Sequence, residues 1–134
     1  MSVEDEVRAA NEAFYAAFRA RDFAAMDRLW ARRAAPRCVH PGWDVLRGRA
    51  PVIQSWRGIL GNPSAPSIEA TDVDVSVIGD VAIVTCHEGE RGQPTQIVAT
   101  NVFVREDGAW RIAHHHAGPL ADPLPPTPDP RDLN

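Results

Sequence analysis

Residues 72–118 read DVDVSVIGDVAIVTCHEGERGQPTQIVATNVFVREDGAWRIAHHHAG, and apolar side chains alternate with polar ones through much of this stretch. At its start every second residue is valine, with Asp or Ser between, which predicts a half-buried β-strand. Three turn signals, Gly79-Asp80, Gly92-Gln93-Pro94 and Asp107-Gly108, divide the remainder. They predict three further strands over residues 81–90, 95–105 and 110–118. Four sequential strands joined by tight turns predict an antiparallel meander.

The residues before this meander have a helical period instead. Apolar side chains recur every three or four residues over 3–18, with Ser2 as N-cap, and Asp22 can cap a second, shorter helix. Residues 37–40 and 43–47 predict a small hairpin around the Pro41-Gly42 turn. A third helix follows Gly48, has a proline in its first turn and ends at Gly61. The chain is therefore predicted to be an α+β protein.

The length of the chain, 134 residues, is that of one domain. We expect this domain over residues 1–118 and a Pro-rich tail over residues 119–134, because six of the 12 prolines lie in the tail and cannot continue a helix or a central strand. Charged residues interrupt the first 20 positions and leave no apolar segment for a signal peptide or membrane span. We therefore expect a cytoplasmic protein with no membrane partner and with Cys38 and Cys86 as reduced thiols.

The charged residues exclude several classes of function. The net charge is −4, and all 14 basic residues are Arg, scattered along the chain without a basic run. Binding to nucleic acid is therefore not expected, since a phosphate backbone needs a concentrated basic surface. The absence of Lys excludes a Schiff-base or lysine-nucleophile mechanism. No G-x-S-x-G elbow and no phosphate-binding glycine loop occurs, and neither cysteine has a signature of an activated thiolate.

The order of elements, three helices interrupted by a short hairpin and followed by a long meander, resembles the nuclear-transport-factor-2-like, or SnoaL-like, superfamily. The resemblance covers roughly residues 3 to 118. Three local motifs support it: Ala20-Arg21-Asp22-Phe23 at the first helix junction, Gly48-Arg49 before the third helix, and the ending from Asp107 to His116. That ending also resembles the last strand of the calcium/calmodulin-dependent kinase association domain, a structural hub.

The resemblance implies a cone-shaped fold in which the three helices of the N-terminal half pack on a strongly curved antiparallel sheet and enclose a pocket. It also implies a homodimer that forms through the outer face of the sheet. The superfamily includes isomerases, dehydratases, cyclases, hydrolases, transport factors and assembly hubs, so function has to be argued from the site.

His40, followed by Pro41, is the sharpest candidate for a catalytic residue. In ketosteroid-isomerase-like members of the superfamily a carboxylate followed by proline serves as general base at about this place, and here the position holds His40. An imidazole can abstract a proton near neutral pH. The alternative is a histidine that hydrogen-bonds a backbone group at the rim of the pocket.

The oxyanion-binding groups of such isomerases, a helix tyrosine and a protonated aspartate, are not matched here. The helix position holds Phe14, with Tyr15 one residue away on a different side of the helix, and the strand position holds Asn101. An amide alone is a weaker oxyanion donor, which argues against steroid-type isomerisation. Asn101 can equally orient a ligand or serve a structural role.

The run His114-His115-His116 lies on the last predicted strand. Alternate side chains of a strand point to opposite faces, so His114 and His116 are expected on the face of Ile112 and His115 on the other. The match to the hub domain places His115, with Asn101, inward. It also places His87 inward, as a ligand-binding or structural residue.

His114 and His116 form a His-x-His motif on a strand, which offers a metal ion two imidazoles on one face. A third ligand would have to come from His40, His87 or an acid such as Glu88, and no second histidine motif exists. We therefore expect no metal and no cofactor. Trp43 and Trp56 are expected near the mouth of the pocket as ligand contacts or as core, with Phe14 and Tyr15 lining it. Asp44 and Glu88 are possible carboxylate partners of a histidine.

Two functions remain open from the sequence. The first is a pocket protein for an apolar small molecule, either binding it or acting as a cofactor-free isomerase, dehydratase or cyclase with His40 as general base and Asn101 and His115 beside it. The second is a non-enzymatic self-assembly module that uses the outer face of the sheet and the tail.

Overall fold

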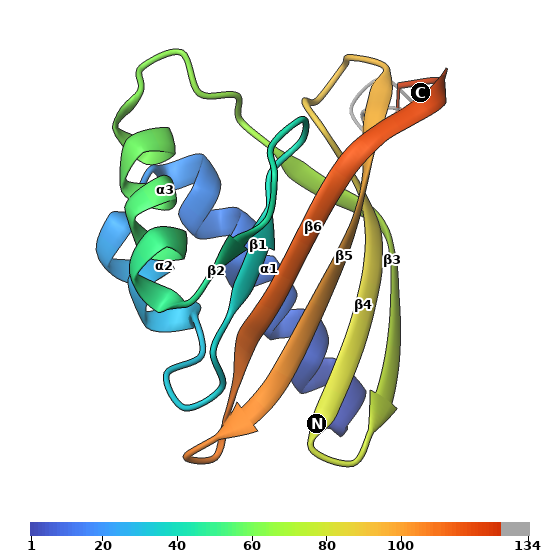
Figure 1. Cartoon of the computed structure of the whole chain (residues 1–134). Helices are drawn as coiled ribbons and strands as arrows, with labels where there is room; N and C mark the ends of the chain where they lie inside the picture. The colour runs from blue at the N-terminus through green and yellow to red at the C-terminus, as the bar shows by residue number, and fades with distance from the viewer. Residues whose placement is uncertain (127–134) are drawn as a thin grey trace.

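The computed structural model describes residues 1–126 of the chain. Within this range three helices and six strands follow one another in the predicted order (Figure 1). They are α1 (Val3–Ala20), α2 (Phe23–Leu29), β1 (Arg37–Val39), β2 (Leu46–Arg47), α3 (Arg49–Gly61), β3 (Glu69–Ile78), β4 (Val81–Gly89), β5 (Thr95–Glu106) and β6 (Ala109–Leu124). Ser2 and Asp22 cap α1 and α2 as predicted. Among these residues no helix is long and apolar enough to cross a membrane.

The strands form one curved sheet in the order β2-β1-β6-β5-β4-β3, and α1 lies across its inner face (Figure 1). The predicted α+β architecture is confirmed, with one difference: β1 pairs in parallel with β6, so the sheet is mixed. Local sequence signals could not predict this pair, because most of the chain lies between β1 and β6. The side chains between α1 and the sheet form the core, and the largest fully buried ones include Trp30, Trp56, Phe14, Phe103 and Met26.

A β-bulge in β6 changes which side chains face the core. Val102 pairs with His114 and Phe103 pairs with Ile112, so Ala113 is an extra residue without a partner on β5. One extra residue reverses the alternation of side chains along the strand. Ile112 and His115 are therefore both buried, although they are three positions apart. The prediction that His114 and His116 share the face of Ile112 was wrong for this reason.

The last strand extends beyond its predicted end at Gly118 and includes Pro119 and Pro123. The parallel partner β1 ends at Val39, opposite His116. Within residues 1–126, β6 beyond that point pairs on one side only, and proline is tolerated on such an edge. The division of the chain into residues 1–118 and a tail of residues 119–134 stays a prediction. Residues 127–134 of that tail lie outside the described residues.

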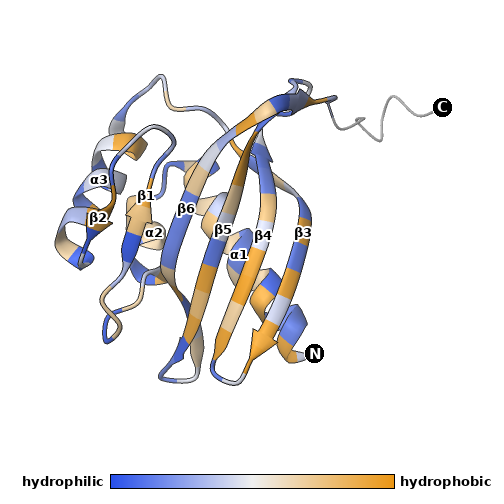
Figure 2. Cartoon of the chain, turned by 45° about the vertical axis from the view of Figure 1, so that its right-hand side comes forward, coloured by the Kyte–Doolittle hydropathy of each residue, from blue (hydrophilic) through white to orange (hydrophobic). Residues whose placement is uncertain are grey.

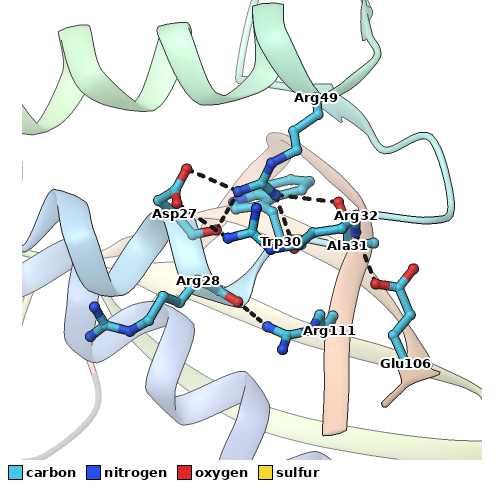
Figure 3. Close-up of polar contacts among 8 residues, drawn as sticks. All are labelled: Asp27, Arg28, Trp30, Ala31, Arg32, Arg49, Glu106 and Arg111. Atoms are coloured by element: carbon cyan, nitrogen blue, oxygen red, sulfur yellow. Dashed lines mark hydrogen bonds and ion pairs between the residues drawn. The ribbon is translucent and has the colours of Figure 1, made fainter.

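Two charged side chains, Arg49 and Glu106, hold the end of α2 and the loop after it in place (Figure 3). Arg49, at the start of α3, donates to the backbone carbonyls of Asp27, Trp30 and Ala31 at 2.8, 3.0 and 3.3 Å, and to the Asp27 carboxylate at 2.9 Å. These carbonyls belong to the end of α2 and the residues after it, where intrahelical donors run out. The Gly48-Arg49 motif therefore holds α3 against α2.

Glu106, at the end of β5, binds the loop that follows α2. Its buried carboxylate accepts hydrogen bonds from the backbone N–H groups of Arg32, Arg33 and Ala34 at 2.8, 3.0 and 2.9 Å. Burial by itself raises the pKa of Glu106, but these N–H donors outweigh burial and hold the pKa below its ordinary value of 4.5. The carboxylate is thus built into the fold in its charged form.

We predict that Glu106→Gln lowers the free energy of unfolding by about 1–3 kcal/mol at pH 7, because charge-assisted hydrogen bonds are replaced by weaker ones. A lowered folded-state pKa gives a contribution that is complete above pH 4.5 and is lost as the pH falls through the folded-state value. The deficit should therefore shrink on acidification. Urea denaturation at pH 7 and pH 4 measures it, with Glu12→Gln, an exposed partner of Arg19, as the control. A deficit that grows at pH 4 would contradict the assignment.

Candidate functional site

A group of buried polar side chains lies between α1 and the inner face of the sheet. We call it the polar cluster, and it consists of Asn11, Tyr15, Glu88, Asn101 and His115. Each of these side chains is at most 5% exposed. Asn11 and Tyr15 are one helical turn apart on α1, and Asn101 and His115 are directly paired on β5 and β6. The cluster therefore joins three strands to the helix that covers them.

The members of the polar cluster hydrogen-bond one another. The Nδ2 amide of Asn101 donates to Asn11 Oδ1 at 2.9 Å and to the Tyr15 hydroxyl at 3.1 Å. The Tyr15 hydroxyl donates to Glu88 Oε2 at 2.6 Å. Nδ1 of His115 lies 2.6 Å from Asn101 Oδ1, and its Nε2 lies 3.8 Å from Glu88 Oε2. The last distance is too long for a hydrogen bond.

His40 adjoins the polar cluster beside His115, with 6.3 Å between the ring centroids. Its Nε2 lies 2.9 Å from Ser55 Oγ on α3. The Ser55 hydroxyl donates its one proton to the carbonyl of Val52 at 2.6 Å, so it can only accept from His40. His40 is therefore protonated on Nε2, and among residues 1–126 its unprotonated Nδ1 has the Cys38 thiol as its hydrogen-bonding neighbour, with Sγ 3.9 Å away.

Aromatic rings enclose His40 and His115. Trp56 is fully buried, with its ring centroid 4.9 Å from that of His40 and 6.0 Å from that of His115, and Phe14 lies 5.1 Å from His115. Trp43, in the β1–β2 turn, lies edge-on to His40 at 4.8 Å and is 50% exposed. Trp43 is thus the boundary between His40 and solvent.

Burial disfavours the charged forms of the titratable side chains in and beside the polar cluster. It lowers the pKa of His40 to about 4 and, with a smaller effect of the His40 charge, that of His115 to about 3. It raises the pKa of Glu88 and, aided by the Glu88 charge, that of Tyr15. Burial therefore acts against an ion pair between Glu88 and His115.

Most of the predicted site residues converge on this region. His40, Asn101, His115, Phe14, Tyr15 and Trp56 are in or against the polar cluster, and Trp43 is at its rim. Their roles remain predictions. Asp44 lies in the exposed turn and accepts from the N–H of Val45, whereas Glu88 is a member of the cluster.

Two predicted orientations were wrong. His87 faces the outer side of the sheet, 3.7 Å from the Asp72 carboxylate, because the inward residues of β4 are the even-numbered ones from Ala82 to Glu88. The outer face of β4 also holds apolar residues, so alternation alone did not fix its phase. Tyr15 is as fully buried as Phe14, because α1 packs against both the sheet and α3. Tyr15 therefore supplies the helix hydroxyl that Phe14 lacks.

Sequence reasoning missed Asn11, Ser55 and Cys86. Asn11 could have been found, since it is a polar residue on the apolar stripe of α1, four positions before Tyr15. Cys86 Sγ lies 3.3 Å from the Tyr15 hydroxyl, and burial raises the pKa of its thiol to about 11.

Among residues 1–126 no three His, Cys, Asp or Glu side chains are grouped to hold a metal ion. A surface pocket of about 390 Å³ lies away from the cluster, around Arg49, Ile53 and Arg57.

Comparisons with known proteins identify relatives of this chain. The model of a family described as SnoaL-like domain matches residues 7–122. A dehydratase-like protein of the NTF2-like family from Streptomyces avermitilis is 38% identical, with a TM-score of 0.79 over 88% of this chain and 96% of that one. A protein from Thiobacillus denitrificans, described as a calcium/calmodulin-dependent protein kinase type II association domain, is also 38% identical, with a TM-score of 0.74 over 84% and 94%.

A more distant relative is the F-box protein SKIP8 of Arabidopsis thaliana, 29% identical over 107 residues. These residues are 80% of this chain but 46% of the plant protein, so the chain spans about half its length. A ketosteroid isomerase-like structure from Parabacteroides distasonis, 15% identical with a TM-score of 0.71 over 90% and 89%, shares the fold.

We predict that the free energy of unfolding decreases as the pH falls from 6.5 to 4. The folded-state pKa of His40 lies below its ordinary 6.5, so in this window the unfolded chain binds the proton that the folded chain excludes. His40→Gln removes this difference and should reduce the loss by on the order of 1–3 kcal/mol. Chemical denaturation at pH 7, 5.5 and 4 measures the slope, and exposed His116→Gln is the control. An unchanged slope in His40→Gln would refute the burial of a neutral imidazole.

Proposed function

The chain belongs to the SnoaL-like domain family, and we propose that it is a small-molecule pocket protein that catalyses a cofactor-free proton transfer, with His40 as general base. The class of reaction is an isomerisation, dehydration or cyclisation of an apolar carbonyl compound. One observation carries this proposal: a buried imidazole whose unprotonated Nδ1 is bordered only by the Cys38 thiol within residues 1–126 lies beside a second buried imidazole, which in turn lies 3.8 Å from the Glu88 carboxyl. Such an arrangement is what general acid–base catalysis requires.

The low pKa of His40 restricts the substrate. An imidazole with a pKa of about 4 is unprotonated at neutral pH but is a weak base. It can remove a proton only from a carbon that an adjacent carbonyl has already acidified. In the isomerisation the C–H proton passes to Nδ1 of His40, the electron pair of that bond forms a C=C bond, and the π pair of the carbonyl moves onto its oxygen. The proton then returns to a different carbon of the same molecule.

The developing oxyanion needs donors that have no other partner. The indole N–H of Trp56 is buried, and within residues 1–126 it has no acceptor stronger than the Cys38 thiol. Trp56 contacts both imidazoles, so its N–H belongs to the same region. The neutral carboxyl of Glu88 is a second donor. We assign these two groups to the oxyanion, with His115 beside Glu88 and Asn101 holding the His115 ring.

Trp43 controls entry in this proposal. Its ring covers His40 and is half exposed, and residues 41–44 of its turn are exposed. A substrate reaches Nδ1 of His40 when the Trp43 ring is displaced. Binding should therefore change the fluorescence of a tryptophan at the surface.

We predict that His40→Ala lowers the rate of α-proton exchange in apolar ketones and enones by at least about 100-fold. Exchange in D₂O, followed by mass spectrometry, measures the rate, and thermal shift identifies the compounds that bind. His87→Ala is the matched control, because that imidazole lies on the other face of the sheet. If no such compound stabilises the protein, or if exchange is equally fast in His40→Ala, the proposal fails.

A second candidate function is self-assembly through the outer face of the sheet. Val81, Ile83 and Val98 are each between 37% and 39% exposed, and the strands that bear them are rich in hydrophobic residues (Figure 2). On the outer face Arg47 pairs with Arg37, and these two arginines form a basic edge next to His114, with which Arg37 also pairs. Asp72 and Asp74 lie on β3 at the opposite edge.

This distribution of charge favours one arrangement of two copies. A two-fold axis parallel to the strands would place the basic edge of each copy over the acidic edge of the other, with the valine and isoleucine side chains between them. A two-fold axis across the strands would oppose like charges. Adjacent arginines without an acid between them are otherwise unfavourable in a sheet.

For this second function we predict that Arg37→Glu and Asp74→Arg each weaken the dimer about tenfold and that the double variant restores it. Sedimentation velocity over a range of concentrations measures the association. Glu12→Arg, on α1, changes the charge to the same extent away from this face and should have no effect. A wild-type chain that remains monomeric at about 0.1 mM, or a double variant weaker than both single ones, would rule the arrangement out.

A further inference from the structure

We infer that Asn101 holds His115 as its Nδ1–H tautomer, so that the bare Nε2 and the Glu88 carboxyl together bind the hydroxyl group of an uncharged ligand. This inference rests on the proposed function for the existence of a ligand. The tautomer is a property of the protein alone and is tested separately.

Hydrogen-bond capacity fixes the tautomer. The Asn101 amide has two N–H bonds, and both are used, on Asn11 Oδ1 and on the Tyr15 oxygen. Its remaining atom, Oδ1, can only accept. The His115 nitrogen 2.6 Å from that oxygen is therefore the protonated one, Nδ1. Nε2 is left with a lone pair inside the core.

The same count of donors and acceptors applies to Tyr15. Its one hydroxyl proton points to Glu88 Oε2, which leaves the oxygen free to accept from Asn101. Asn101 is thus held on three sides, by Asn11, Tyr15 and His115. It is a positioning residue, since it acts on the ligand only through the ring that it orients.

His115 Nε2 and Glu88 Oε2 are two hydrogen-bonding atoms that one ligand group can join. Nε2 and Oε2 are 3.8 Å apart, too far to satisfy each other. One hydroxyl oxygen about 2.8 Å from each can donate to Nε2 and accept from the carboxyl. Such a hydroxyl would join Tyr15, Glu88 and His115 in a single chain of hydrogen bonds.

The absence of a cation from the polar cluster sets the charge of the ligand. None of its five members is Arg, and the chain contains no Lys. A carboxylate or phosphate placed there would lose its hydration without gaining a counter-charge, which costs several kcal/mol. An alcohol, a phenol or an enol meets no such penalty. The site is therefore selective for neutral hydroxyl compounds.

The tautomer is tested on the full chain by two-bond ¹H–¹⁵N correlation of ¹⁵N-labelled histidine at pH 7. We expect the Nδ1–H pattern for His115, identified by its loss in His115→Gln. Asn101→Asp keeps only acceptors opposite Nδ1 and should preserve the pattern, whereas Asn101→Ala should allow the Nε2–H form to appear. An Nε2–H pattern in the wild-type chain would overturn the inference whatever the protein binds.

Ligand charge is tested with matched probes, phenol and 2-naphthol against benzoate and 2-naphthoate, by tryptophan fluorescence and thermal shift. Each hydroxyl compound should bind at least tenfold more tightly than its carboxylate. Glu88→Gln, which keeps a neutral donor, should bind within threefold of wild type, and Glu88→Leu should lose binding. Equal or tighter binding of the carboxylates overturns the selectivity. If none of the four binds while the Nδ1–H pattern is present, the ligand assignment fails and the role of Asn101 stands. Absence of exchange activity from a wild-type chain that binds 2-naphthol would instead refute the proposed function.

Discussion

The exclusion of water from the space between α1 and the sheet is the constraint on which the site depends. Polar groups in such a space must satisfy one another, because each unpaired donor or acceptor costs about 1–3 kcal/mol. Asn11, Tyr15 and Asn101 meet this demand with three hydrogen bonds among themselves and Glu88. The same exclusion holds the two imidazoles in their neutral forms and raises the pKa of the Glu88 carboxyl. Protonation state, tautomer and rigidity thus have one physical origin.

The rest of the fold keeps that space closed. Arg49 ties α3 to the end of α2, and Glu106 ties the following loop to β5. Since α3 supplies Trp56 and Ser55, the position of α3 determines what encloses and orients His40. Charged contacts at the periphery therefore set the geometry of uncharged groups inside.

The two faces of the sheet have separate roles in this picture. The inner face has the polar cluster, and the outer face has an apolar strip between a basic and an acidic edge. His115 and His114 are neighbours in sequence, yet one belongs to each face. Two structures that are 38% identical to this chain have different descriptions, one as a dehydratase-like protein and the other as a kinase association domain.

The sequence by itself determined the number, kind and order of the elements, because periodicity, caps and turn residues act over a few positions. It also indicated His40, Asn101 and His115 as candidate site residues. In the structure Asn101 and His115 are hydrogen-bond partners. What it could not give was the facing of His87, the burial of Tyr15 and the place of Ile112 relative to His115. These were decided by the phase of β4, the packing of α1 on two elements and the bulge at Ala113. Protonation was likewise a tertiary outcome, because desolvation and hydrogen-bond capacity depend on side chains that are up to 90 positions apart, as Asn11 and Asn101 are.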